Sequence, residues 1–124
     1  MQVRELDHVV LVTPDVERSL GFYTELLGMP GVRLDEWRAG TVPFPSVRIN
    51  AGTIIDILHG ARDGENMNHL CLVVDRADVD AVAGDPRFHV VDGPGTRYGA
   101  RGNGWSVYVS DPDNNVVELR SYDP

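Results

Sequence analysis

Two histidines and two carboxylates recur at matching places along the sequence. His8 lies in the apolar run LDHVVLV (6–12), and His69 lies in the similar run MNHLCLV (67–73). Asp56 follows two isoleucines, Glu118 follows two valines, and the carboxylates are separated by almost the same number of residues as the histidines. Imidazole and carboxylate groups are ligands that Zn, Mn, Fe, Co and Ni accept, often with coordination positions left open. The pattern therefore predicts a divalent-metal site that can polarise substrate oxygens or a bound water.

The alternation of residues around these groups predicts which way they face. Side chains alternate along a strand, so the aliphatic neighbours of Asp56 and Glu118 point away from the carboxylates and can pack on a helix. Buried imidazoles and carboxylates without partners are costly, and a divalent cation accounts for all four together. We expect His8, His69 and Glu118 to be ligands, while Asp56 is either a ligand or a plain polar residue. Either carboxylate is a candidate general base.

The recurring segments divide the chain into two tandem modules within a single domain of residues 1–124. Module one covers about 5–58 and module two about 67–122, and the polar, glycine-bearing linker 60–66 joins them. Each module is predicted to contain a strand, a helix and three further strands, which is an α+β fold made of two βαβββ units. The predicted strands are 6–12, 31–37, 46–50 and 53–58 in module one, and 68–74, 87–91, 105–110 and 115–121 in module two.

Helices and loops complete each predicted module. Thr13 or Asp15 can cap the first helix, and Gly28 suits its C-terminal end. The second helix is shorter, at about 78–83. Two stretches rich in proline or glycine, 39–45 and 92–104, are predicted to be open loops of the kind that often contact ligands. Residues 111–115, with the sequence DPDNN, predict a tight turn.

Four further side chains are candidates for contacts with a substrate. Ser106 and Tyr108 alternate with valines, so they are expected to face the same cavity. Arg48 is expected to share an inward face with them. Arg120 lies two residues after Glu118 on the same face, where it could bind an anionic group or pair with Asp56.

Composition narrows the classes of partner. The chain has 124 residues, a formal net charge of −8 and a single cysteine, Cys71. Nucleic acid and anionic membranes need a basic footprint, so neither is expected as a partner. One cysteine cannot form an internal disulfide, and the N-terminal residues contain no apolar run typical of a signal peptide or membrane span. The chain is therefore predicted to be cytoplasmic, with a small molecule as its ligand.

Three stretches resemble a known superfamily. They are LDHVVLVTPDVERSLGFYTELLGM (6–29), NHLCLVVD (68–75) and WSVYVSDPDNNVVELRSY (105–122). In their order and spacing they are similar to the vicinal oxygen chelate superfamily, which includes glyoxalases, bleomycin-resistance proteins and extradiol dioxygenases. The resemblance implies an eight-stranded cupped sheet with flanking helices, and a homodimer. It also implies metal ligation by His8, His69 and Glu118, with Asp56 as the carboxylate that glyoxalases add at the end of module one.

The resemblance implies a metal-dependent enzyme of the glyoxalase type. Such an enzyme would be a lyase or isomerase, whose Zn, Mn, Ni, Co or Fe ion chelates vicinal oxygens of a small substrate and stabilises an anion. Thiol transfer of the fosfomycin-resistance type is an alternative, although Val10 stands where those enzymes usually have a hydroxyl. A single-domain dioxygenase is another. The third alternative is a non-catalytic protein that binds cationic drugs. The drug-binding members of the superfamily lack the two histidines and the glutamate that bind metal in the others. Asp56 is one methylene shorter than the usual glutamate, so it could bind a metal through water.

Overall fold

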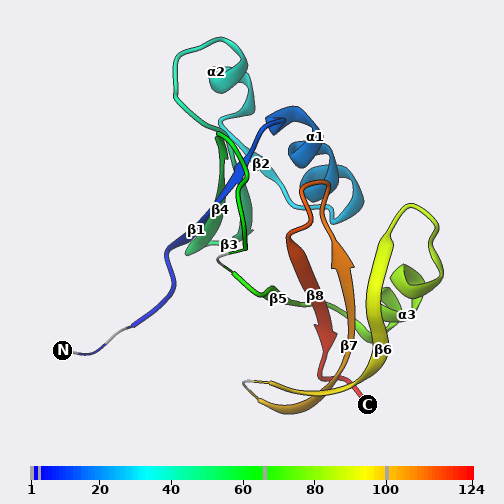
Figure 1. Ribbon diagram of the computed structural model, residues 1–124. Coiled ribbons are helices and arrows are strands. Elements are labelled where there is room, and N and C mark those ends of the chain that lie inside the picture. Colours follow the sequence, from blue (N-terminus) through cyan, green and yellow to red (C-terminus); the bar gives the residue numbers. More distant parts are fainter. Residues whose placement is uncertain (1, 3, 66, 100) are drawn as a thin grey trace. The chain divides into compact units, whose positions relative to one another are not determined.

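The computed structural model describes residues 2, 4–65, 67–99 and 101–124 of the chain (Figure 1). The chain divides into two compact units, Met1–Asp63 and Gly64–Pro124. Each unit contains one four-stranded sheet with a helix between its first and second strands. The predicted α+β fold with two βαβββ modules is confirmed.

The sheet of unit one has the strand order β1-β4-β3-β2. Its strands are β1 (His8–Thr13), β2 (Gly31–Val32), β3 (Ser46–Asn50) and β4 (Thr53–His59). β1 pairs with β4 in parallel, whereas the β3–β4 and β2–β3 pairs are antiparallel. The first and last strands of the unit are therefore neighbours, and this pairing brings the histidine of β1 near the carboxylate of β4.

The two faces of this sheet differ as the alternation predicts. Val47, Ile55 and Ile57 are almost completely buried on one face, and helix α1 (Val16–Leu20) contacts β4 there. Asp56 lies between Ile55 and Ile57 and points to the other face. The apolar neighbours thus pack on the helix and fix the direction of the carboxylate.

The helix of unit one begins and ends where the sequence suggests. Asp15 is the N-cap, and its side chain accepts a hydrogen bond of 3.1 Å from the backbone N–H of Arg18. The helix continues as a π-helical segment, η1 (Gly21–Leu26), which widens the turn so that Phe22 and Tyr23 are both buried. Gly28 follows with φ +71°, a left-handed conformation that glycine adopts without steric cost.

Unit two has the matching strand order β5-β8-β7-β6. Its elements are β5 (Leu70–Val73), α3 (Arg76–Gly84), β6 (His89–Gly99), β7 (Gly102–Ser110) and β8 (Val116–Ser121). β5 pairs with β8 in parallel, and the other pairs are antiparallel. Helix α3 contacts β6, β7 and β8, and Val79, Val107 and Val117 are fully buried. The core of the unit therefore lies between α3 and the sheet (Figure 1).

Two predicted segments are wrong. The strand expected at 31–37 stops after β2, because Arg33 has φ 61° and turns the chain into helix α2 (Leu34–Arg38). The acidic residues Asp35 and Glu36 in the first turn and the basic Arg38 in the last suit the dipole of a helix, a signal that the strand prediction missed.

The loop expected at 92–104 is instead most of the long hairpin formed by β6 and β7. Its glycines serve strand pairing rather than an open loop. The register shifts between Val90 and Asp92 and between Asp92 and Gly95, and Gly93 has φ +83°. Such bulges let a strand bend while its pairing continues. The turn predicted at 111–115 is confirmed, since Asn114 is left-handed and Asp111 accepts hydrogen bonds from the backbone of Asp113 and Asn115. In the described residues, no helix is long and apolar enough to cross a membrane.

Candidate metal centre

In unit two a histidine and a glutamate face each other. Glu118 on β8 lies opposite Cys71 of β5, and His69 precedes Cys71 by two residues, so all three share a face. The distance from His69 Nε2 to Glu118 Oε2 is 3.1 Å. On the other side of the ring, His69 Nδ1 is 2.7 Å from Asn68 Oδ1. Because an amide oxygen only accepts, Nδ1 carries the proton in this bond and Nε2 has a lone pair in the neutral ring.

This arrangement suits a cation between the two groups. A neutral Nε2 and a carboxylate oxygen are both acceptors, so their approach is favourable only with a proton or a metal cation between them. A second hydrogen bond that fixes the tautomer of the histidine is a common feature of metal-binding imidazoles. The pair can therefore supply one nitrogen and one oxygen ligand.

Glu118 is held by a guanidinium on the same strand. Its side chain is only 4% exposed, and its Oε1 accepts hydrogen bonds from Arg120 Nη2 at 2.7 Å and Nε at 3.1 Å. Burial by itself would raise the pKa of Glu118, but hydrogen bonds from Ser106 and Arg120 and the charge of Arg120 outweigh it. The pKa of Glu118 is therefore below its ordinary value, and the group is a carboxylate at neutral pH.

Tyr108 and Ser106 lie on β7 beside this pair. Tyr108 is directly opposite Glu118 in the strand register, and Ser106 is opposite Arg120. The ring of Tyr108 meets the His69 ring edge to face, with centroids 5.5 Å apart. Burial, followed by the negative charge of Glu118, raises the pKa of Tyr108, so its hydroxyl is a donor at neutral pH.

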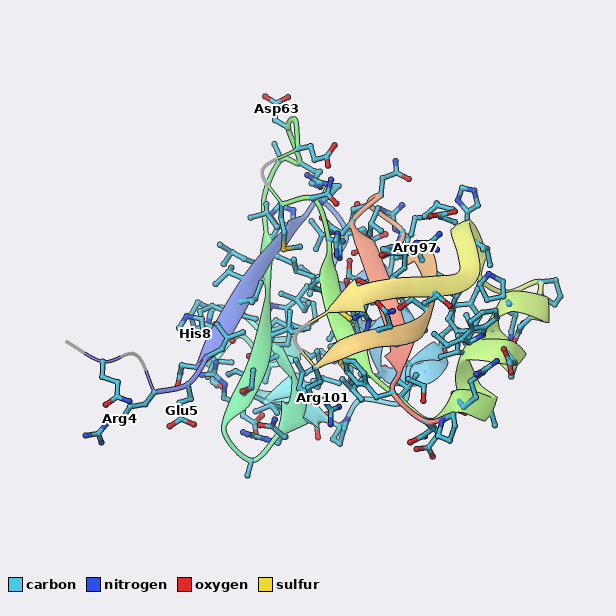
Figure 2. The ribbon with its side chains drawn as sticks, turned by 90° about the horizontal axis from the view of Figure 1, so that it is seen from below. Arg4, Glu5, His8, Asp63, Arg97 and Arg101 are labelled. Atoms are coloured by element: carbon cyan, nitrogen blue, oxygen red, sulfur yellow. The ribbon has the colours of Figure 1, made fainter. Side chains whose placement is uncertain are left out.

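Unit one repeats the arrangement with a looser contact. Asp56 on β4 lies opposite Val10 of β1, and His8 precedes Val10 by two residues. The distance from His8 Nε2 to Asp56 Oδ2 is 4.0 Å, and His8 Nδ1 donates to Asp7 Oδ2 at 2.7 Å. The hydrogen bond to Asp7 is the main cause of a raised pKa of His8, and the charge of Asp56 adds to it. Figure 2 labels His8 at the start of β1.

The environment of Asp56 is simpler than that of Glu118. Asp56 is 7% exposed and accepts a hydrogen bond of 2.6 Å from Ser46 Oγ on the neighbouring strand. Leu58 occupies the position, two residues further along β4, that corresponds to Arg120 on β8. The two histidine–carboxylate pairs thus share backbone placement but differ in what holds the carboxylate.

The remaining predicted residues have definite places. Arg48 is on β3, and its Nη1 donates to the backbone oxygens of Asn50 and Ala51. It lines an open hollow in unit one together with Glu5 and Asp7. Each unit brings one histidine and one carboxylate together, and among the described residues no group of three or more His, Cys, Asp or Glu is gathered in a way that could hold a metal. The ligand and substrate-binding roles therefore stay predictions.

The sequence reasoning missed the residues that orient the histidines. Asp7 and Asn68 each precede a proposed ligand and bind its Nδ1. The repeat contained this signal, because a residue with a side-chain oxygen precedes the histidine in both modules. Ser46, the partner of Asp56, was also missed, since neither repeat nor motif marks it.

Comparisons with known proteins identify the family of the chain. A family model described as the Glyoxalase/Bleomycin resistance protein/Dioxygenase superfamily matches residues 5–119. The glyoxalase domain-containing protein RDO1 of Mycosarcoma maydis is 34% identical over 139 residues, which cover 98% of this chain and 70% of that protein. A virulence protein of Salmonella typhimurium is 29% identical, with 98% of this chain and 87% of that protein covered. A solved integron cassette protein of V. cholerae is 26% identical, with a TM-score of 0.78 and coverage of 99% of this chain and 98% of that one. The resemblance noted from three sequence stretches is confirmed, and the chain belongs to the Glyoxalase/Bleomycin resistance protein/Dioxygenase superfamily.

Proposed function

We propose that the chain is a divalent-metal-dependent enzyme of the glyoxalase type, a lyase or isomerase acting on a small oxygen-rich substrate. His8, Asp56, His69 and Glu118 are its proposed metal ligands. One observation carries the proposal. In both units the Nε2 atom of a histidine faces a carboxylate of the last strand, while a neighbouring side chain binds Nδ1; His8 is the first residue of β1, and His69 directly precedes β5. The two histidine side chains are 47% and 34% exposed, so a ligand can reach them, and the feature fits the donor set of Zn, Mn, Ni, Co or Fe.

The proposed chemistry assigns a role to each group. When bound, the divalent ion supplies Lewis acidity toward adjacent oxygens of the substrate. The hydroxyl of Tyr108 is a proposed hydrogen-bond donor to the substrate, and Arg48 is a proposed contact for an anionic group. Ser106 and Arg120 are almost completely buried and bind Glu118, so they are proposed to support the site from behind. A carboxylate, Asp56 or Glu118, takes up the proton that an isomerase or lyase step removes next to a carbonyl. The name of the Mycosarcoma maydis relative supports the glyoxalase type.

Metal content tests the proposal directly. The chain should be produced without a histidine tag, and its bound metal measured by mass spectrometry beside the His69→Ala variant. We expect close to one metal per chain and its loss in the variant. His89→Ala is a matched control, because His89 is exposed and its ring bonds to the Ser110 hydroxyl instead of to a carboxylate. Hemithioacetal substrates should then be assayed with each metal. Absence of metal from the wild type after incubation with excess Zn, Mn, Ni and Fe(II) would refute the proposal.

A binding protein without catalysis is the second candidate. The net charge of −8 favours a cationic ligand. Calorimetric titration with a bleomycin-type drug tests this, and binding by a metal-free chain without turnover would favour it over the enzyme. Fosfomycin with a thiol, and catechols with oxygen, belong in the same screen for the transferase and dioxygenase alternatives. A homodimer is also proposed from the family, and light scattering measures it.

A further inference from the structure

Arg120 distinguishes the two histidine–carboxylate pairs. It is 2% exposed, and two of its nitrogens donate to the same atom, Oε1 of Glu118. The other carboxylate oxygen, Oε2, is the one that lies 3.1 Å from His69 Nε2. The guanidinium therefore occupies one edge of the carboxylate and leaves the opposite oxygen directed at the histidine.

The guanidinium is itself held in place. Its Nε also donates to Ser106 Oγ at 3.1 Å, and its Nη1 donates to the Tyr122 hydroxyl at 3.3 Å. A planar guanidinium bound on several sides has little freedom, so it limits rotation of the carboxylate that it binds. No comparable group holds Asp56 in the described residues, where Ser46 alone donates to Oδ1 at 2.6 Å and Leu58 takes the place of the arginine.

We propose that Arg120 is a positioning residue, which presents Oε2 of Glu118 as a fixed metal ligand. The inference rests on the proposed function. It also separates the roles of the two carboxylates, since Glu118 is locked whereas Asp56, held by one neutral hydroxyl, keeps the freedom to reorient. Arg120 then acts on the metal through Glu118, and not as a contact for an anionic substrate.

The burial and contacts of two arginines support this assignment over a substrate contact. The Arg120 guanidinium binds Glu118, Ser106 and Tyr122, and its side chain is almost inaccessible. Arg97 on β6, labelled in Figure 2, is 36% exposed and lies 5.9 Å from the centre of the Tyr108 ring. Arg97 pairs with the exposed Asp92 rather than with a proposed ligand, so it is a suitable control.

A double-mutant cycle on metal affinity tests the proposal. The metal-free chain and its Arg120→Met, Glu118→Gln and doubly substituted variants should be titrated with Zn or Co(II) in competition with a chromophoric chelator. We expect Arg120→Met to weaken binding by about 10- to 100-fold, the usual effect of removing a group that orients a ligand. Arg97→Met should change affinity less than about 2-fold. In the Glu118→Gln background Arg120→Met should have no further effect, because its only route to the metal is gone.

Several outcomes would overturn the inference. Unchanged metal affinity in Arg120→Met, with a raised KM alone, would make Arg120 a substrate contact. An equal further loss in the Glu118→Gln background would make its effect structural. If Arg120→Met does not fold by circular dichroism, Arg120→Lys replaces it, with a smaller loss expected, and wild-type affinity there would overturn the inference equally. A wild-type chain that binds no metal refutes the proposed function first, whereas metal binding indifferent to Arg120 refutes only this inference.

Discussion

Burial should make the Glu118–Arg120 pair far more sensitive to substitution than an exposed pair of similar geometry. Arg120→Met leaves the Glu118 carboxylate buried without its guanidinium. Arg38→Met removes the partner of Glu17, an ion pair with a similar N–O distance, 2.8 Å against 2.7 Å. The side chains of Arg38 and Glu17 are 47% and 55% exposed, whereas those of Arg120 and Glu118 are 3% and 4% exposed. The two pairs therefore differ greatly in burial, and Arg120 also donates to Ser106 and Tyr122.

The structure sets the expected magnitudes. Opposite charges about 4 Å apart attract by about 4 kcal/mol at an effective dielectric constant of 20, and breaking a buried pair from one side typically costs about 3–5 kcal/mol. We expect Arg120→Met to lower the free energy of unfolding by that amount. The exposed pair is screened by solvent, so Arg38→Met should lower the free energy of unfolding far less than Arg120→Met does. The double variant Glu118→Gln/Arg120→Met should recover part of the loss, because no buried charge is left unpaired.

Urea unfolding of the metal-free chain measures these differences. Circular dichroism and tryptophan fluorescence should be followed in EDTA, at low salt and at 1 M NaCl. High salt should shrink the effect of Arg38→Met and leave that of Arg120→Met nearly unchanged. Equal losses for Arg120→Met and Arg38→Met, or a loss for Arg120→Met that salt abolishes, would refute the reasoning from burial.

Three further substitutions or reactions test particular features. Asp15→Ala removes the acceptor that caps α1 and should cost about 1 kcal/mol, measured by urea unfolding, whereas Asp15→Asn should cost little. Gly93→Ala should lower the free energy of unfolding by about 1–3 kcal/mol, because φ is +83° and the new Cβ would lie 2.7 Å from the Ser106 carbonyl oxygen. Gly84→Ala in α3 is the control, and it should be neutral or stabilising because, in the described part of the chain, no atom beyond the adjacent residues and the backbone of its own helix lies within 4 Å of the new Cβ. Equal shifts in melting temperature for the two variants would contradict this. Cys71 is exposed as a residue, but partial burial of its thiol and the charge of Glu118 raise the pKa to about 11 from 9.0. The fraction of Cys71 present as thiolate at pH 8 should thus be about 100-fold below that of an ordinary thiol. Alkylation of Cys71 by iodoacetamide should be at least about 10-fold slower than that of free cysteine, and an equal rate would be inconsistent with this environment.

Periodicity was sufficient to predict most of the fold. Alternation around Asp56 and Glu118 indicated which neighbours pack on a helix, and Ile55, Ile57, Val117 and Leu119 are indeed buried. It failed where single residues redirect the backbone. Arg33 ends a strand by adopting a left-handed conformation, which a pattern of hydrophobic residues does not predict. The glycines of 92–104 were interpreted as an open loop, although bulges let the same residues pair as strands.

The candidate site was predictable only in part, for a related reason. A repeat identifies residues that both modules keep, and so it found His8, His69, Asp56 and Glu118. It gives no information on residues that differ between modules, which is why the partner of Arg120 was left open between an anionic group and Asp56. The ion pair with Glu118 depends on side-chain conformations that sequence spacing does not specify.

The parallel pairing of the first and last strands in each unit also affects the order of events during synthesis. His8 and Asp56 come from opposite ends of unit one, as His69 and Glu118 do in unit two, so neither pair exists until its last strand has been made. About 60 residues separate Asp56 from Glu118, and a ribosome adds roughly 5–20 residues per second. The pair of unit one can therefore form some 3–12 s, in order of magnitude, before Glu118 is added. The full set of four proposed ligands exists only once β8 has been translated, so the proposed metal binding, if it uses all four, must follow synthesis of that strand.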